Sequence, residues 1–250
     1  MLSLKRNPAS PKPKNNYSAL HKLASVVDEI QFTSKQCYNW TMNKPQNILA
    51  YYTICSKLKD TIRTGWKKWN VKKSRLESVA EHVYGTQMLA LAMYSEYNYD
   101  IDIMKVIFML AIHEIGEAAI GDFTPFDISH KEKERLEHEA VHKVLSNLIE
   151  RDEIEKYFLE FDAHETPEAK FAYQCDKLEA ELQCKIYDEG NYVDLQNLPD
   201  NEVTSNTEVQ ELIQKYPWSE AFAMYDRKLV DYDQNFLEVS NYAVKHQTTQ

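Results

Sequence analysis

Apolar residues recur every three or four positions along most of this chain, which is the periodicity of amphipathic α-helices. One stripe of this kind runs through Val79, Val83 and Ala90 within residues 78–98. We find no convincing strand pattern, no internal repeat and no glycine-rich phosphate loop. The pattern therefore predicts an all-α protein built around a single core.

Capping residues, glycine and proline indicate where the predicted helices begin and end. Asp102 is a typical N-cap, Gly121 a typical helix stop, and Thr166 followed by Pro167 marks the start of a long helix. The predicted helices cover residues 17–32, 46–63, 78–98, 103–120, 131–150, 152–161, 167–187, 208–215 and 218–239. We expect loops over residues 64–74, 122–130 and 188–206.

The chain ends differ in composition from the rest. Residues 1–16 contain three prolines and four basic residues (three Lys and one Arg) with few apolar side chains, which is typical of disorder. We therefore expect a single-domain helical bundle with an N-terminal extension. Its parts are an N-terminal tail and helix over residues 1–45, one folded domain over 46–240 and a C-terminal tail over 241–250.

Charge limits the possible partners. The chain carries 29 Lys and Arg against 39 Asp and Glu, a formal net charge of −10. An acidic protein repels a phosphate polymer, so we expect no nucleic-acid polymer as a partner. A small phosphorylated substrate stays compatible with this charge, provided that local cations offset the field.

Other features bear on the compartment. The four cysteines form no CxxC pair, and no stretch approaches the ~20 apolar residues of a membrane span. The N-terminal residues lack the apolar region of a secretory signal. We therefore expect a cytoplasmic protein with reduced thiols and no membrane partner.

Ionisable residues occur within an apolar stretch near the middle of the chain. His113, Glu114 and Glu117 follow the apolar run of residues 108–112, and Asp122 comes shortly after them. Buried imidazole and carboxylate groups are costly unless they are paired or bind a cation. On a helical wheel His113, Glu114 and Glu117 share one half of the helix.

Two further ligand types lie on neighbouring predicted helices. His82 is on an apolar stripe, and Asp176 lies among apolar residues of the long helix after Pro167. Three helices can thus bring His82, His113, Glu114 and Asp176 to one divalent ion, for which mixed N/O ligation suits Mn, Co, Mg, Zn, Fe or Ni. A buried histidine is more often an ordinary core residue, so spacing alone leaves both interpretations open. The HExxH zinc-protease motif is excluded, because Glu117 occupies its last position.

Five segments occur in an order that resembles the HD-domain phosphohydrolases, in particular the 5′-deoxynucleotidase branch of YfbR-type bacterial enzymes and their eukaryotic relatives. The segments are residues 63–66 (RTGW), 77–82 (ESVAEH), 113–117 (HEIGE), 121–125 (GDFTP) and 168–179, which contains Asp176. The resemblance implies that His82, His113, Glu114 and Asp176 bind one metal ion. Glu114 stands where the family has Asp.

The resemblance also implies a reaction and roles for further residues. The reaction is removal of the 5′-phosphate from (deoxy)nucleoside monophosphates by a homodimer or another homo-oligomer. Glu117 matches the catalytic glutamate, and Asp122 matches a second acidic residue near the metal. The implied substrate contacts are Arg63, Trp66, Lys67 and Thr124. Hydrolysis of nucleoside triphosphates or other phosphoesters, a non-catalytic nucleotide- or metal-binding regulator and a structural helical adaptor are alternatives.

Overall fold

The computed structural model describes residues 43–124 and 126–248. They form helices joined by turns and loops, and the extended pairing among them is one isolated bridge between Ile62 and Ser78. The all-α prediction is therefore confirmed. The predicted helix over residues 17–32 and the N-terminal tail lie outside the described residues. None of the helices described is both long enough and apolar enough to cross a bilayer.

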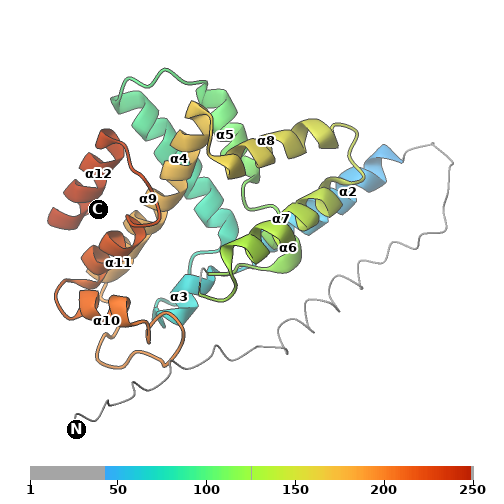
Figure 1. The fold of residues 1–250 in the computed structure, drawn as a ribbon. Coiled ribbons are helices and arrows are strands. Elements are labelled where there is room, and N and C mark those ends of the chain that lie inside the picture. Colours follow the sequence, from blue (N-terminus) through green and yellow to red (C-terminus); the bar gives the residue numbers. More distant parts are fainter. Residues whose placement is uncertain (1–42, 125, 249–250) are drawn as a thin grey trace, which may run out of the picture. The chain divides into compact units, whose positions relative to one another are not determined.

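The helices follow the predicted order (Figure 1). They are α2 (Lys44–Cys55), η1 (Ser56–Lys59), α3 (Thr64–Lys68), α4 (Val79–Glu96), α5 (Ile103–Ile112), α6 (Glu117–Ile120), α7 (His130–Leu145), α8 (Arg151–Ala163), α9 (Pro167–Glu189), α10 (Thr207–Ile213), α11 (Trp218–Asp226) and α12 (Gln234–Lys245). The predicted helix ends agree with the structure where a capping residue acts on backbone groups a few residues away. Asp102 accepts hydrogen bonds from two backbone N–H groups of α5, Thr166 caps α9, and Gly121 ends α6 with φ of 84°.

The structure corrects several predicted boundaries. The helix predicted over 103–120 is interrupted at residues 113–116, where bonds from Ile115 to Ile112 and from Glu117 to Glu114 tighten the backbone into turns. The loop predicted over 64–74 contains α3. The helix predicted over 218–239 is two helices, because Asp233 caps a new start at α12. The predicted domain limits at residues 45 and 240 stay predictions; residue 45 lies in α2 and residue 240 in α12.

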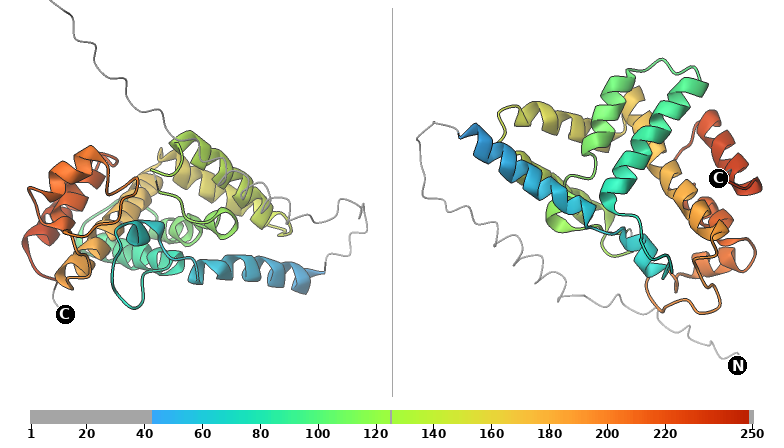
Figure 2. Two further views of the ribbon diagram at one scale, coloured as in Figure 1. Left: turned by 90° about the horizontal axis from the view of Figure 1, so that it is seen from below. Right: turned by 180° about the vertical axis from the view of Figure 1, so that it is seen from behind.

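Helix α9 is at the centre of residues 43–248 and packs against α4, α5, α8, α11 and α12. Figures 1 and 2 show it passing between α4 and the C-terminal helices. Phe171 near its start and Leu178 at its middle join an apolar cluster with Met109 of α5 and Phe236 of α12. Near its end, Tyr187 joins a second cluster that contains three buried tryptophans. The buried polar residues of α9 are Gln174, Asp176, Glu179 and Glu181.

Candidate active site

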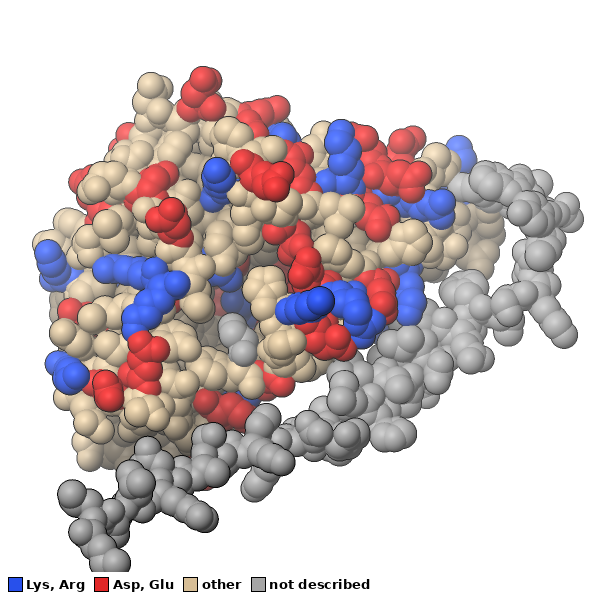
Figure 3. All heavy atoms as spheres, in the orientation of Figure 1, with Lys and Arg blue, Asp and Glu red and all other residues tan. Residues whose placement is uncertain are grey.

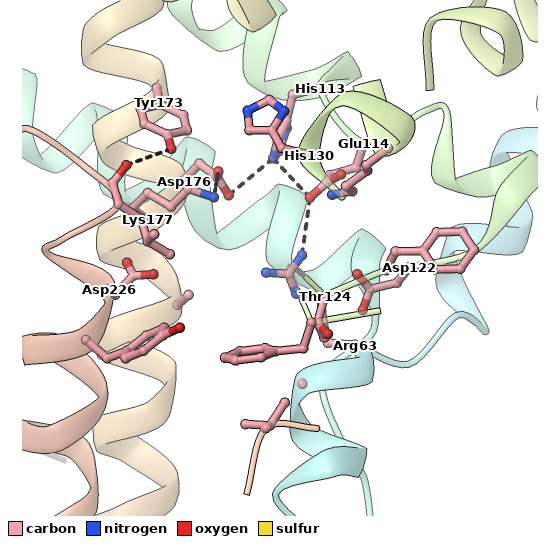
Figure 4. Close-up of a pocket in the computed structure, with 18 of the residues that line it drawn as sticks. Arg63, His113, Glu114, Asp122, Thr124, His130, Tyr173, Asp176, Lys177 and Asp226 are labelled. Carbon is pink, nitrogen blue, oxygen red and sulfur yellow. Dashed lines mark hydrogen bonds and ion pairs between the residues drawn. The ribbon is translucent and has the colours of Figure 1, made fainter. Parts of the chain in front are cut away.

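The four predicted metal ligands converge. His82 comes from α4, His113 and Glu114 from the turn after α5, and Asp176 from α9. One donor atom of each lies within 4.8 Å of the others, and all four residues are buried. His82 Nε2 is 2.9 Å from Asp176 Oδ1, and Glu114 Oε1 is 3.8 Å from Nε2 of each histidine. Figure 4 shows His113, Glu114 and Asp176 facing one another.

These distances fit a shared divalent ion. Ligand atoms held at about 2.1 Å from one ion lie about 3.0–3.5 Å apart, close to the separations found here. His113 Nδ1 lies 2.8 Å from the carbonyl oxygen of Leu110, to which a protonated Nδ1 donates. Its Nε2 is buried without a hydrogen-bond partner among the described residues. A lone pair aimed at two carboxylates is the arrangement that a cation requires.

His82 is held from behind by Glu179. Glu179 Oε2 is 2.5 Å from His82 Nδ1, and both side chains are buried. Glu179 lies one helical turn after Asp176 on α9, so the two carboxylates contact opposite edges of the same imidazole ring. Donation from Nδ1 to Glu179 directs Nε2 and its lone pair towards the other three predicted ligands.

Three cations surround the carboxylates. Arg63 Nη1 is 3.2 Å from Glu114 Oε1, Lys177 Nζ is 3.0 Å from Asp176 Oδ2, and Lys133 Nζ is 3.7 Å from Glu117 Oε1. Burial alone would raise the pKa of Glu114, but nearby positive charge lowers this pKa to about 2. Lys177 and the hydrogen-bonded His82 likewise overcome burial and hold the pKa of Asp176 well below its usual value.

Glu117 has the opposite electrostatic environment. Burial raises its pKa well above the usual value, and the negative charges of Glu114 and Asp122 raise it further. Both of its carboxylate oxygens are buried without a hydrogen-bond partner among the described residues. Asp122 is different, because its Oδ2 accepts a hydrogen bond from the backbone N–H of Thr64. A carboxylate with a raised pKa beside a cation site is suited to accept a proton.

A cavity of about 600 Å³ opens beside this cluster. Its walls include three of the predicted ligands, residues of α3 and of the loop after Gly121, and residues of α7, α9 and α11. In Figure 4, Lys177 and Asp226 lie on one side, with Arg63, Asp122 and Thr124 across from them. Acidic and basic side chains are interspersed on the molecular face in Figure 3.

The structure places most of the predicted substrate contacts at this cavity. Arg63, Trp66 and Thr124 all line it. Trp66 is 97% buried (3% exposed), and its Nε1 donates to Glu77 Oε2 at 2.6 Å, so only a small part of the ring is accessible. Burial and the neighbouring Glu179 raise the pKa of Glu77 to about 7.

The position of Lys67 differs from the expectation that it contacts the substrate. Its side chain is exposed and lines a separate groove with Lys59 and Arg75, because successive residues of α3 point in different directions. The structure instead brings Lys133 and Lys177 to the cavity. Lys177 is adjacent to Asp176 in a segment that the motifs already included. Lys133 has no comparable sequence signal, because its placement depends on how α7 packs.

The chain resembles known proteins in sequence. A family model described as HD domain matches residues 55–216. The chain is 35% identical over 150 residues to the 5′-deoxynucleotidase HDDC2 of Dictyostelium discoideum, covering 57% of this chain and 78% of that protein. It is 31% identical over 148 residues to the 5′-deoxynucleotidase HDDC2 of Homo sapiens, covering 58% and 70%.

Solved structures share the fold. The PH0347 protein of Pyrococcus horikoshii superposes with a TM-score of 0.59 at 20% identity, covering 79% of this chain and 98% of that one. A protein of Magnetospirillum magnetotacticum, described as a predicted metal-dependent phosphohydrolase, superposes with a TM-score of 0.53 at 20% identity, covering 84% and 99%. The helical fold and the buried histidine–carboxylate cluster define an HD-type protein. The chain belongs to the HD domain family.

Proposed function

We propose that this protein is a divalent-metal-dependent phosphohydrolase that removes the 5′-phosphate from (deoxy)nucleoside monophosphates. The observation that carries the proposal is the meeting of His82, His113, Glu114 and Asp176, the last three of which line a large cavity. The Glu117 carboxylate, which has no hydrogen-bond partner among the described residues, follows on the next turn of the chain. The names of the HDDC2 relatives support the substrate class.

The four residues suit one ion from the group Mn, Co, Mg, Zn, Fe and Ni, because they offer two imidazoles and two carboxylates. When bound, such an ion polarises a phosphoryl group and lowers the pKa of a water molecule. Glu114 reaches the cluster from the same turn as His113 and accepts a hydrogen bond from Arg63. Glu114 is longer by one methylene group than the Asp found at this position in the family, and Arg63 holds its carboxylate end.

The surrounding side chains supply the remaining steps. Glu117 orients the attacking water and accepts its proton. Arg63 and Lys177 offer positive charge to the phosphate oxygens and to the charge that develops during displacement. Asp122, held by the backbone N–H of Thr64, positions the water or protonates the leaving sugar oxygen.

A Glu117→Gln variant tests the assignment. Gln has the same shape but cannot accept the proton, so we expect turnover to fall by about 100-fold or more while the metal content stays unchanged. Glu153→Gln, at an exposed residue of α8, is the matched control. Phosphate release is measured across nucleoside mono- and triphosphates with each candidate ion, and metal content by elemental analysis. Unchanged turnover in Glu117→Gln refutes the assigned role.

We also propose that the protein forms a homodimer or another homo-oligomer and is located in the cytoplasm. Ile48, Leu49 and Tyr52 of α2 are each more than half exposed, which is unfavourable in water and favours self-association. Cys175 and Cys184 are buried free thiols, as expected in a reducing compartment. Light scattering on the protein as it elutes from a size-exclusion column measures its mass. A monomer at micromolar concentration contradicts the proposed self-association. Cell fractionation tests the second.

A further inference from the structure

Helices α7 and α8 carry a second group of metal-binding side chains. The two helices pack against each other (Figure 1). Glu134 and His138 lie one turn apart on α7, and Asp162 lies in the last turn of α8. Side chains four residues apart share one face of a helix, so the two from α7 meet the one from α8. One donor atom of each residue lies within 4.8 Å of the others, and we call these three residues the α7–α8 group.

The α7–α8 group has the ligand types and spacing that a transition-metal ion requires. One imidazole and two carboxylates are common ligands of Zn²⁺. His138 Nε2 is 2.8 Å from Asp162 Oδ2. Ligand atoms bound to one ion lie about 3.0–3.5 Å apart, so displacements of about 1 Å allow all three residues to reach a shared ion. The side chains of His138 and Asp162 are 35% and 27% exposed, which gives an ion a path from solvent.

The carboxylates of the α7–α8 group lack the basic partners that other carboxylates of α7 have. Lys133 and Arg135, which flank Glu134 in the sequence, form their ion pairs with other glutamates. The Glu134 side chain forms no ion pair or hydrogen bond with the described residues, and Asp162 forms its ion pair with His138. Two carboxylates that face one imidazole repel each other unless a positive charge lies between them. A divalent cation supplies that charge.

His142 provides a comparison on the same two helices. It lies one turn after His138, and its Nδ1 is 3.2 Å from both carboxylate oxygens of Glu155 on α8. Its side chain is 62% exposed, and no third His, Cys, Asp or Glu among the described residues completes a group with this pair. The contact between α7 and α8 therefore contains an ordinary histidine–carboxylate pair next to the α7–α8 group, which has three ligands.

We propose that Glu134, His138 and Asp162 bind a divalent transition-metal ion of the Zn²⁺ class, separate from any ion held by the buried cluster. Glu134 and Asp162 line the same cavity as that cluster. Three protein ligands leave at least one coordination position for water or for an oxygen atom of a molecule in the cavity. The site uses none of the four ligands of the buried cluster, so the inference does not depend on the proposed reaction.

The decisive experiment counts the Zn²⁺ ions bound by the wild-type protein, by His138→Ala and by His142→Ala. Calorimetry gives the number of ions and their affinities, and elemental analysis after gel filtration gives an independent count. His142→Ala is the matched control, because both histidines lie on α7 and face a carboxylate of α8. We expect His138→Ala to bind one equivalent fewer than the wild-type protein, and His142→Ala to bind the same number.

A double variant tests whether the ligands belong to one ion. His138→Ala combined with Asp162→Asn should lose no more Zn²⁺ than His138→Ala alone, because residues that bind one ion do not contribute independently. Equal numbers of ions on the wild-type protein and on His138→Ala overturn the proposal. So does an equal loss in His142→Ala, which would show that exposed histidines bind the ion without a built site. A loss of two equivalents in the double variant also overturns it, because the two residues would then belong to different sites.

Discussion

Gly85 is the residue whose substitution tests the orientation of His82 most directly. It lies on α4 one turn after His82, facing the carboxylate of Glu179. A Cβ atom at this position would lie 2.4 Å from Glu179 Oε1 and 3.0 Å from its Cδ. Ordinary contact begins at 3.4 Å, so Gly85→Ala forces the carboxylate to move by about 1 Å. That displacement is enough to break the 2.5 Å contact with His82 Nδ1.

The expected effect falls on metal affinity and not on the fold. The clash is with the end of a flexible side chain, and Ala is a better helix residue than Gly by about 1 kcal/mol, so metal-free stability should change little. Loss of a carboxylate that orients a metal-binding histidine weakens metal binding by about 10–100-fold, or about 1.4–2.7 kcal/mol. We therefore expect the dissociation constant of the bound ion to rise by that factor.

The assay is competition with a metal chelator, with denaturant unfolding of the metal-free protein as the check on folding. The matched control is Gly85→Ala in a Glu179→Ala background, where the new methyl group has no carboxylate to displace. The substitution should then have no further effect on affinity. Wild-type metal affinity in the single Gly85→Ala variant would refute the claim that Glu179 orients His82.

The remaining predictions concern stability. Burial raises the pKa of Glu181 to about 7, so the folded state binds this proton more tightly than the unfolded state, with its ordinary value of 4.5. This contribution to stability is complete below pH 4.5 and is lost as the pH rises through 7. Glu181→Gln should therefore flatten the pH dependence and be more stable at pH 8, by at most ~3 kcal/mol, in urea unfolding at pH 5 and pH 8. Trp66→Phe removes the N–H group that donates to Glu77, so it should lower the free energy of unfolding. The loss should exceed that of Trp218→Phe by about 1–3 kcal/mol, because Trp218 Nε1 has no hydrogen-bond partner among the described residues. Equal losses of stability in denaturant unfolding would contradict this.

Local signals in the sequence predicted the helix ends well, whereas interruptions within apolar stretches were missed. Asp102 and Thr166 act on backbone groups within three residues, so their effect is visible in the sequence. The turn at residues 113–116 (HEIG) directly follows an apolar helical run, and its tighter hydrogen bonds cannot be inferred from periodicity. The break between α11 and α12 was missed for a similar reason. The aromatic residues Trp218, Phe222, Tyr225, Tyr232 and Phe236 recur every three, four or seven positions, as they would on one helix.

The break between α11 and α12 places the two helices in different apolar clusters. Trp218 of α11 packs in the cluster around Trp66, whereas Phe236 of α12 packs against Phe171 in the other cluster. A continuous helix would have predicted one shared face for these residues. The break also leaves Asp226 at the end of α11, where its carboxyl group reaches the cavity. The position of Asp226 at the cavity wall was therefore not visible in sequence patterns, because it depends on where a helix ends.

The site also explains how an acidic protein accommodates an anionic substrate. Around the ligand cluster, Arg63, Lys133 and Lys177 face four carboxylates, those of Glu114, Glu117, Asp122 and Asp176. Glu137 beside Lys133 and Glu179 beside His82 add further negative charge, and a bound divalent ion adds two positive charges to this cluster. The net charge of −10 on the chain therefore does not determine the local field. Metal binding should make this end of the cavity attractive to phosphate, which links ion loading directly to substrate binding.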